Sequence, residues 1–246
     1  MDLFWPLILS SIAGFSTLLG YFFIYLPVKK VNEFIPFALS FSLSVMIMIS
    51  VFDLIPSSIP FIGNNPIKSI LIFVIFFTLG IILVHILNKL IEREKGKSNL
   101  YRLGILSFIA LVLHNFPEGI LTFMSTYKDF SLGLSLCLSI TLHNIPEGIS
   151  IAVPIYYSTT NKWEAFKITL LSALAEPLGA IVAFLVLKNH ITNEMISVVL
   201  ILVAGIMISL SINKMLPEAR GYQKKKPLYY GFILGIIIVL LSLFIL

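Results

Sequence analysis

The chain alternates long apolar runs with short polar connections. Charged residues, Pro or Asn bound eight such runs, at 4–28, 34–56, 66–91, 103–125, 131–154, 165–188, 194–216 and 228–246. A helix needs about 20 mostly apolar residues to cross a bilayer. The pattern therefore predicts an all-α membrane protein with eight transmembrane helices. The connections leave no room for a folded domain outside the membrane, so we expect one transmembrane domain over 1–246.

The composition supports the membrane assignment. Apolar and aromatic residues make up 58% of the chain and charged residues 12%, with a mean hydropathy of +1.01. Soluble domains carry about 25% charged residues, so a soluble domain is excluded. No basic segment precedes the first run, and we expect a retained helix rather than a signal peptide. Cys137 is the only cysteine, which excludes an intramolecular disulfide.

The basic residues predict how the chain crosses the membrane. The first, third, fifth and seventh connections and their flanks carry fourteen Lys and Arg residues, against three on the other side. Cytoplasmic loops of membrane proteins are enriched in Lys and Arg. The odd connections are therefore predicted in the cytoplasm, and both termini outside it. The topology accounts for the net charge of +5. We therefore expect the chain to contact the lipid bilayer and to bind no nucleic acid.

The chain also repeats itself. The segment 114–120, His-Asn-Phe-Pro-Glu-Gly-Ile, recurs at 143–149 with six of seven residues identical. Adjacent spans run in opposite directions, so the second copy is inverted. A weaker echo links 46–56 to 207–217 through Met-Ile, Ser and Pro at the same spacing. We expect inverted repeats over about 4–91 and 165–246 around central helices 103–125 and 131–154. Such repeats with Pro- and Gly-interrupted helices are typical of transporters.

Five ionisable residues fall near the centres of predicted spans, namely His114, Glu118, His143, Glu147 and Glu176. Each charge at the bilayer centre costs at least about 2.5–3.5 kcal/mol. Three carboxylates at one depth also repel one another. Protons or a bound cation must compensate.

The spacing favours the cation. His at position i and Glu at i+4 project from one helical face, and an Asn flanks that face in each copy. Two antiparallel copies together offer two imidazoles, two amides and two carboxylates, with Glu176 nearby. Nitrogen and oxygen donors of this kind suit Zn²⁺, Fe²⁺, Mn²⁺ or Co²⁺.

These residues carry a family resemblance. Two copies of His-Asn-x-Pro-Glu-Gly on the fourth and fifth spans, followed by Ala-Glu-Pro-Leu-Gly at 175–179 on the sixth, closely resemble the ZIP divalent-metal transporters, in particular the ZupT-like bacterial branch. The resemblance implies the ZIP fold, an inverted 3+2+3 repeat. It also implies uptake of zinc, with iron, manganese, cobalt or cadmium, into the cytoplasm across a prokaryotic plasma (inner) membrane. The resemblance implies a homodimer and no catalytic cofactor.

The resemblance assigns two neighbouring metal positions. His114, Glu118, His143 and Glu147 form one of them. The other takes Asn115, Asn144 and Glu176, and the two motif glutamates bridge both positions.

One departure from the family pattern lies at the inner end of the seventh span. The branch has acidic residues where this chain has Asn213 and Lys214, whereas the inverted counterpart Asp53 persists near the outer end of the second span. We expect Asp53 to attract an incoming cation and Lys214 to disfavour a cation at the exit. The alternative is that Lys214 simply extends to the lipid headgroups.

Two other functions fit the same inventory. An intramembrane metallohydrolase would use a midplane metal to activate water. A structural or sensing protein would hold a metal without releasing it. The symmetric duplication favours a transporter over an enzyme, because translocation has two equivalent sides and catalysis does not.

Overall fold

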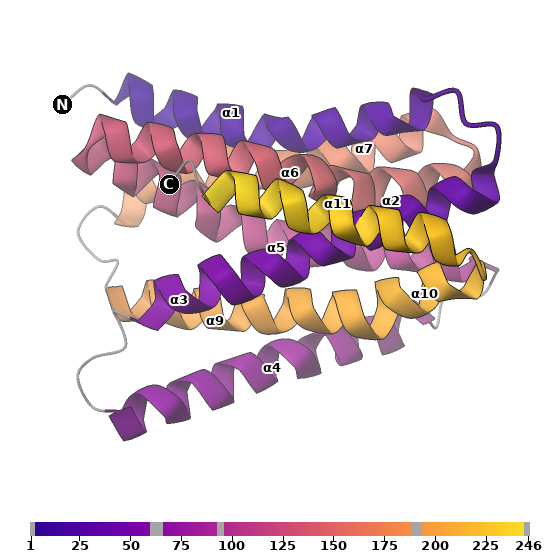
Figure 1. Cartoon of the computed structure of the whole chain (residues 1–246). Helices are drawn as coiled ribbons and strands as arrows, with labels where there is room; N and C mark the ends of the chain where they lie inside the picture. The colour runs from indigo at the N-terminus through magenta and orange to yellow at the C-terminus, as the bar shows by residue number, and fades with distance from the viewer. Residues whose placement is uncertain (1–2, 60–65, 93–95, 188–192, 244–246) are drawn as a thin grey trace.

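The computed structural model describes residues 3–59, 66–92, 96–187 and 193–243, with the side chains of 186, 187, 193 and 196 left out. Eight helical segments in this part of the chain are long and apolar enough to cross a membrane. The sequence prediction of an all-α protein with eight spans is confirmed. The first described helix begins, and the last one ends, at the same end of the bundle, as eight crossings require (Figure 1).

In the described part of the chain four spans are single helices, and the others are built in pieces. The first span is α1 (Phe4–Tyr21) with the 3₁₀ turn η1 (Phe22–Tyr25), and the third is α4 (Pro66–Glu92). The fourth is α5 (Asn99–Lys128), the fifth α6 (Phe130–Thr159) and the eighth α11 (Lys225–Leu243). The predicted end of the eighth run, 244–246, lies outside the described residues.

The second and seventh spans share an unusual construction. The second consists of α2 (Val31–Ile49), the π-helical turn η2 (Ser50–Leu54) and α3 (Ile55–Ser58). The seventh consists of α9 (Asn193–Leu210), the π-helical turn η5 (Ser211–Met215) and α10 (Leu216–Gly221). Each π-turn precedes a proline, Pro56 or Pro217, which lacks the N–H that an α-helix needs there. The weak sequence echo therefore marks equivalent distortions.

The sixth span is interrupted, which the sequence analysis did not predict. The pattern predicts one helix over the run 165–188, but α7 (Lys162–Ala173) ends at Ala173. After Leu174, α8 (Ala175–Val182) begins, followed by η4 (Ala183–Leu187). Pro177 cannot donate to the carbonyl of Ala173, whereas a proline is tolerated in the first turn of a helix. The break places Glu176 in the first turn of α8. Position 188 lies outside the described residues.

The packing partners of the two halves correspond. In the first half α1 packs on α6, α2 on α11 and α4 on α9, and in the second half α8 packs on α5. Suppose that the first three spans are exchanged with the last three, and α5 with α6. The contact between α1 and α6 then becomes the contact between α8 and α5, and the contact between α2 and α11 becomes that between α9 and α4. This exchange is what an inverted 3+2+3 repeat requires. Helix α4 lies along one edge of the bundle against α9 (Figure 1).

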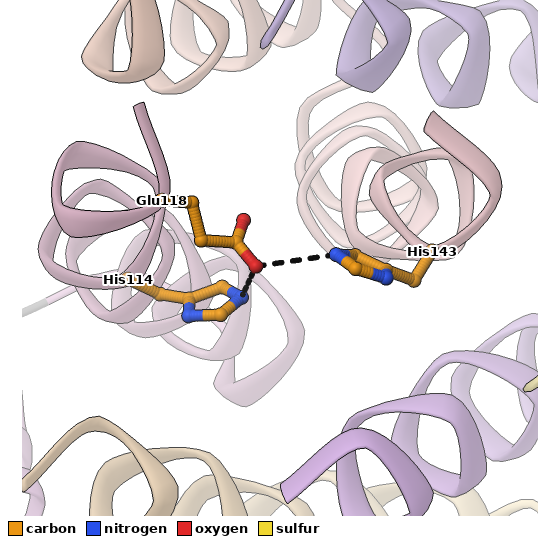
Figure 2. Close-up of side chains that lie close together, drawn as sticks. All are labelled: His114, Glu118 and His143. Carbon is orange, nitrogen blue, oxygen red and sulfur yellow. Dashed lines mark hydrogen bonds and ion pairs between the residues drawn. The ribbon is translucent and has the colours of Figure 1, made fainter. Parts of the chain in front are cut away.

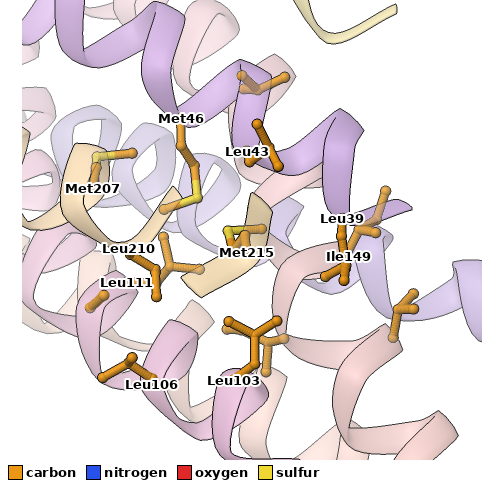
Figure 3. Packing of buried hydrophobic residues seen from close by; sticks show 14 of the residues in the cluster. Leu39, Leu43, Met46, Leu103, Leu106, Leu111, Ile149, Met207, Leu210 and Met215 are labelled. Atoms are coloured by element: carbon orange, nitrogen blue, oxygen red, sulfur yellow. The ribbon is translucent and has the colours of Figure 1, made fainter. Parts of the chain in front are cut away.

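The apolar core lies between α2, α5, α6 and the seventh span. Met46 and Met207, at equivalent positions of the repeat, are both fully buried in it. Leucines of α2 and α5, with Ile149 of α6, fill the space around them (Figure 3). This core holds α2 and α9 against the two central helices.

Candidate metal centre

Helices α5 and α6 form an antiparallel hairpin that sets the depth of the site. A single residue, Asp129, connects them, and its carboxylate caps α6 by accepting the Leu132 N–H at 3.0 Å. His114 lies fifteen residues before Asp129 and His143 fourteen residues after it. At 1.5 Å per residue both histidines are about 21–22 Å from the connection, near the middle of helices roughly 45 Å long. The hairpin therefore brings the two motif copies to one level.

One carboxylate oxygen joins the two imidazoles. Glu118 Oε1 lies 3.2 Å from His114 Nε2 and 3.2 Å from His143 Nε2 (Figure 2). One donor atom from each of these three residues lies within 4.8 Å of the other two. All three side chains are buried. His114, Glu118 and His143 thus form a compact group that offers two nitrogens and an oxygen.

Glu147 reaches the same group from the other helix. Its Oε1 lies 3.3 Å from His114 Nε2. In a tetrahedral zinc site with bonds of about 2.0–2.1 Å, neighbouring ligand atoms are about 3.3–3.4 Å apart. The three N···O separations of 3.2–3.3 Å in this cluster are close to that edge length. Glu147 thus contacts the group of His114, Glu118 and His143 through His114, at a separation close to that between neighbouring zinc ligands.

Several polar atoms of the site make no hydrogen bond. Within the described part of the chain these include both carboxylate oxygens of Glu147, Glu118 Oε2 and both side-chain atoms of the Asn115 amide. A buried polar group without a hydrogen bond costs about 1–3 kcal/mol. Each oxygen here is a donor atom for a divalent cation. The described side chains of the cluster therefore do not form a self-contained polar network.

A second contact brings Asn144 and Glu176 together. The Asn144 Nδ2 group donates to the Ala13 carbonyl at 2.9 Å and to Glu176 Oε1. Asn144 Oδ1 and Glu176 Oε2 make no hydrogen bond. Both residues are fully buried. The structure therefore pairs two of the three residues predicted for a second metal position, and leaves Asn115 buried without a hydrogen bond.

Glycine allows α8 to approach α5 closely enough to bring Glu176 here. A Cβ added at Gly119 would lie 2.0 Å from the Glu176 carbonyl oxygen, closer than any real contact. The approach therefore requires a glycine. Gly119 follows Glu118 directly, so the contact fixes Glu176 beside the motif.

The predicted entrance and exit residues lie outside the central cluster. Asp53, in η2, is half-buried and accepts a hydrogen bond from Ser57 Oγ at 3.1 Å. Asn213, in η5, is exposed and donates to Ser209 Oγ at 3.3 Å. Lys214 Nζ lies 3.9 Å from Glu92 Oε1, and both residues line a cavity at the end of α4.

Two features of the site were not predicted from sequence. The Ala13 carbonyl that orients Asn144 is a backbone group, and residue type says nothing of its role. The sequence analysis does not single out Glu92, which contacts Lys214. The sequence feature that could have drawn attention to Glu92 is its negative charge, since it stands among the basic residues of 89–97.

Comparisons with known proteins identify the family of the chain. The family profile described as ZIP Zinc transporter matches residues 92–243. Proteins named zinc transporter ZupT from Streptococcus mutans and Oceanobacillus iheyensis are 38% and 37% identical, over 98% and 97% of this chain and 97% of each relative. The protein of the same name from Chlorobium phaeovibrioides is 38% identical over 100% of this chain and 99% of its own length.

Proposed function

The chain belongs to the ZIP family of zinc transporters, and from this premise we propose that it carries zinc into the cytoplasm through the buried cluster on α5 and α6. The family is one of transporters, so the protein is a multi-pass membrane transporter and not an enzyme. The curated relatives are named for zinc alone. We extend the substrate range to Fe²⁺, Mn²⁺, Co²⁺ and Cd²⁺ because imidazole and carboxylate donors bind all of these ions.

One observation carries the proposal. A single Glu118 oxygen lies 3.2 Å from the Nε2 atoms of both His114 and His143, while other oxygens of the same cluster make no hydrogen bond. A divalent ion at this place would neutralise the carboxylates and supply a partner for the unsatisfied oxygens. Soft thiolate ligands are absent from this set, which suits an ion that is bound and then released.

We place a second metal position beside the first. It takes Asn115, Asn144 and Glu176, with Glu118 and Glu147 shared between the two positions. The contact between Asn144 and Glu176 supports this placement. A shared carboxylate would allow an ion to pass from one set of ligands to the next without leaving oxygen coordination.

The membrane setting follows from charge. We propose that the chain resides in a prokaryotic plasma membrane as a single transmembrane domain, with both termini outside the cytoplasm and its Lys- and Arg-rich connections inside. Asp53 then lies near the outer mouth, and Asn213 and Lys214 near the inner one. Two copies assemble as a homodimer in this proposal.

Zinc flux into proteoliposomes tests the function. Purified protein is reconstituted with a trapped zinc-sensitive dye, and external ZnCl₂ is varied. We expect saturable entry that Glu118→Gln reduces at least about tenfold, because the substitution removes a charge-assisted ligand worth roughly 1.5–3 kcal/mol. Glu33→Gln is the matched control, since Glu33 lies on the partly exposed start of α2 and pairs with Lys30. Wild-type vesicles that admit no zinc, or Glu118→Gln vesicles that admit it normally, would refute the proposal.

A further inference from the structure

A polar cavity lies between the centre and the Lys- and Arg-rich end of the bundle. Its volume is about 340 Å³, and it is lined by Asn88, Glu92, Asn99, Arg102, Leu103, Leu106, Asn213, Lys214, Pro217 and Glu218. Leu106 and Leu103 lie on α5 eight and eleven residues before His114. At 1.5 Å per residue the cavity is about 12–16 Å along the helix from the metal cluster. The cavity therefore lies along α5 from the cluster, toward the Lys- and Arg-rich end.

The charges on the cavity wall balance. Among the lining residues that the structure describes, two are acidic, Glu92 and Glu218, and two are basic, Arg102 and Lys214. Lys214 Nζ lies 3.9 Å from Glu92 Oε1, and its side chain is only 28% exposed. The ammonium group therefore lies against the cavity wall instead of extending freely to the headgroups. The formal charge of the wall is zero only because Lys214 contributes to it.

The repeat gives this lysine an acidic counterpart. The echo between 46–56 and 207–217 aligns Asp53 with Lys214, and both stand in the π-turns η2 and η5. The two halves of the chain thus place opposite charges at equivalent points near opposite ends of the path. The carboxylate attracts a cation, whereas the ammonium repels one.

We propose that Lys214 is a tethered counter-cation that keeps the inner cavity neutral, so that a divalent metal leaving the centre is released rather than retained. The inference rests on the proposed function. Without Lys214 the wall would carry a net charge of −1 and would present carboxylate and amide oxygens, which hard and borderline cations bind. Lys214 supplies the positive charge that these oxygens would otherwise take from the metal.

Coulomb's law gives the size of the effect expected when the charge of Lys214 is removed. A unit charge about 8 Å from a divalent ion, in a partly hydrated cavity with a dielectric constant of about 40–80, changes ion retention on the order of tenfold. Lys214→Gln should therefore lower both KM and kcat for zinc uptake by about that factor, because a retained ion leaves slowly. Lys214→Arg keeps the charge and should match the wild type.

Charge-balanced double variants separate this role from a simple ion pair. Uptake of radioactive zinc is measured in cells that express each variant, and binding of Co²⁺ to the purified protein is measured in parallel. Lys214→Gln combined with Glu92→Gln restores a neutral wall, and so does Lys214→Gln combined with Glu218→Gln. Both doubles should regain wild-type KM and Co²⁺ affinity. An ion-pair role predicts recovery only with Glu92→Gln, the residue that Lys214 contacts.

The outcomes decide between the two proposals. Tighter Co²⁺ binding by Lys214→Gln that both doubles reverse would support the counter-cation role even if no variant moved zinc, in which case the transport proposal alone would fail. Normal zinc uptake with unchanged KM and Co²⁺ affinity in Lys214→Gln would overturn the counter-cation role and leave transport intact. Recovery in the double variant with Glu92→Gln, but not in the one with Glu218→Gln, would also overturn the counter-cation role.

Discussion

Replacing Gly119 by alanine tests whether the close approach of α5 and α8 builds the site. The added Cβ would lie 2.0 Å from the Glu176 carbonyl oxygen and 2.7 Å from the Glu176 Cα, whereas ordinary contact begins near 3.4 Å. The obstructing atoms are backbone, so no side chain can rotate away. The two helices must separate locally by about 1.4 Å. This is the difference between the 3.4 Å of ordinary contact and the 2.0 Å from the added Cβ to the Glu176 carbonyl oxygen.

This separation acts on function more than on folding. Overpacking of this kind costs about 1–3 kcal/mol of stability. The displacement also carries Glu176 away from Asn144, and a ligand shifted by about 1 Å no longer meets the geometry that a metal site needs. We expect Gly119→Ala to fold, with a lowered melting temperature, and to reduce zinc flux at least about tenfold.

Gly221→Ala is the matched control. Gly221 ends α10, and a Cβ added there meets no atom within 4 Å. Thermal unfolding in detergent and zinc flux in proteoliposomes are measured for both variants. Wild-type stability and flux in Gly119→Ala would refute the claim that this approach fixes the site, because the helices would then have accommodated a methyl group without consequence.

Four further predictions concern the pH dependence of uptake and three other polar residues. Zinc uptake should fall as the external pH is lowered from about 7 to 5.5, because protons compete with the metal for carboxylates and imidazoles; initial rates across that range check it, and a flat profile contradicts it. Asn144→Ala should lower the free energy of unfolding by about 1–3 kcal/mol, because it removes the donor to Ala13 and Glu176. Asn115→Ala should leave that free energy nearly unchanged, because its amide makes no hydrogen bond, and should reduce zinc flux as the loss of a ligand. Asp53→Asn should raise the KM for zinc at low ionic strength with little change in kcat, and added salt should shrink the difference.

The eight spans were predictable because a bilayer restricts the possible structures. Length and apolarity suffice where every backbone group must be paired inside its own helix. The cluster was predictable for a related reason. A repeated motif on two adjacent antiparallel spans must meet at one depth if the connection lies midway, and Asp129 does lie midway between His114 and His143.

The remaining features depend on tertiary packing. The break at Leu174 needed more than Pro177, since α5 and α6 run continuously through Pro117 and Pro146. The position of the proline differs. Pro177 falls in the first turn of α8, whereas Pro117 and Pro146 lie inside the longer helices. A sequence without coordinates does not show which neighbour satisfies the freed carbonyl, and so does not show whether a helix continues.

The lack of hydrogen bonds in the central cluster is an argument about purpose. A polar group buried only to fix helix contacts gains most when all of its donors and acceptors are paired, because a half-satisfied network is less stable than an apolar core. Here Glu147 makes no hydrogen bond through either oxygen, although it is fully buried and lies 3.3 Å from His114. In the transport proposed above, a divalent ion among these residues would give the unpaired oxygens a partner. Stability alone gives no reason for this arrangement, whereas the transport proposed above requires ligands that are complete only while the ion is passing.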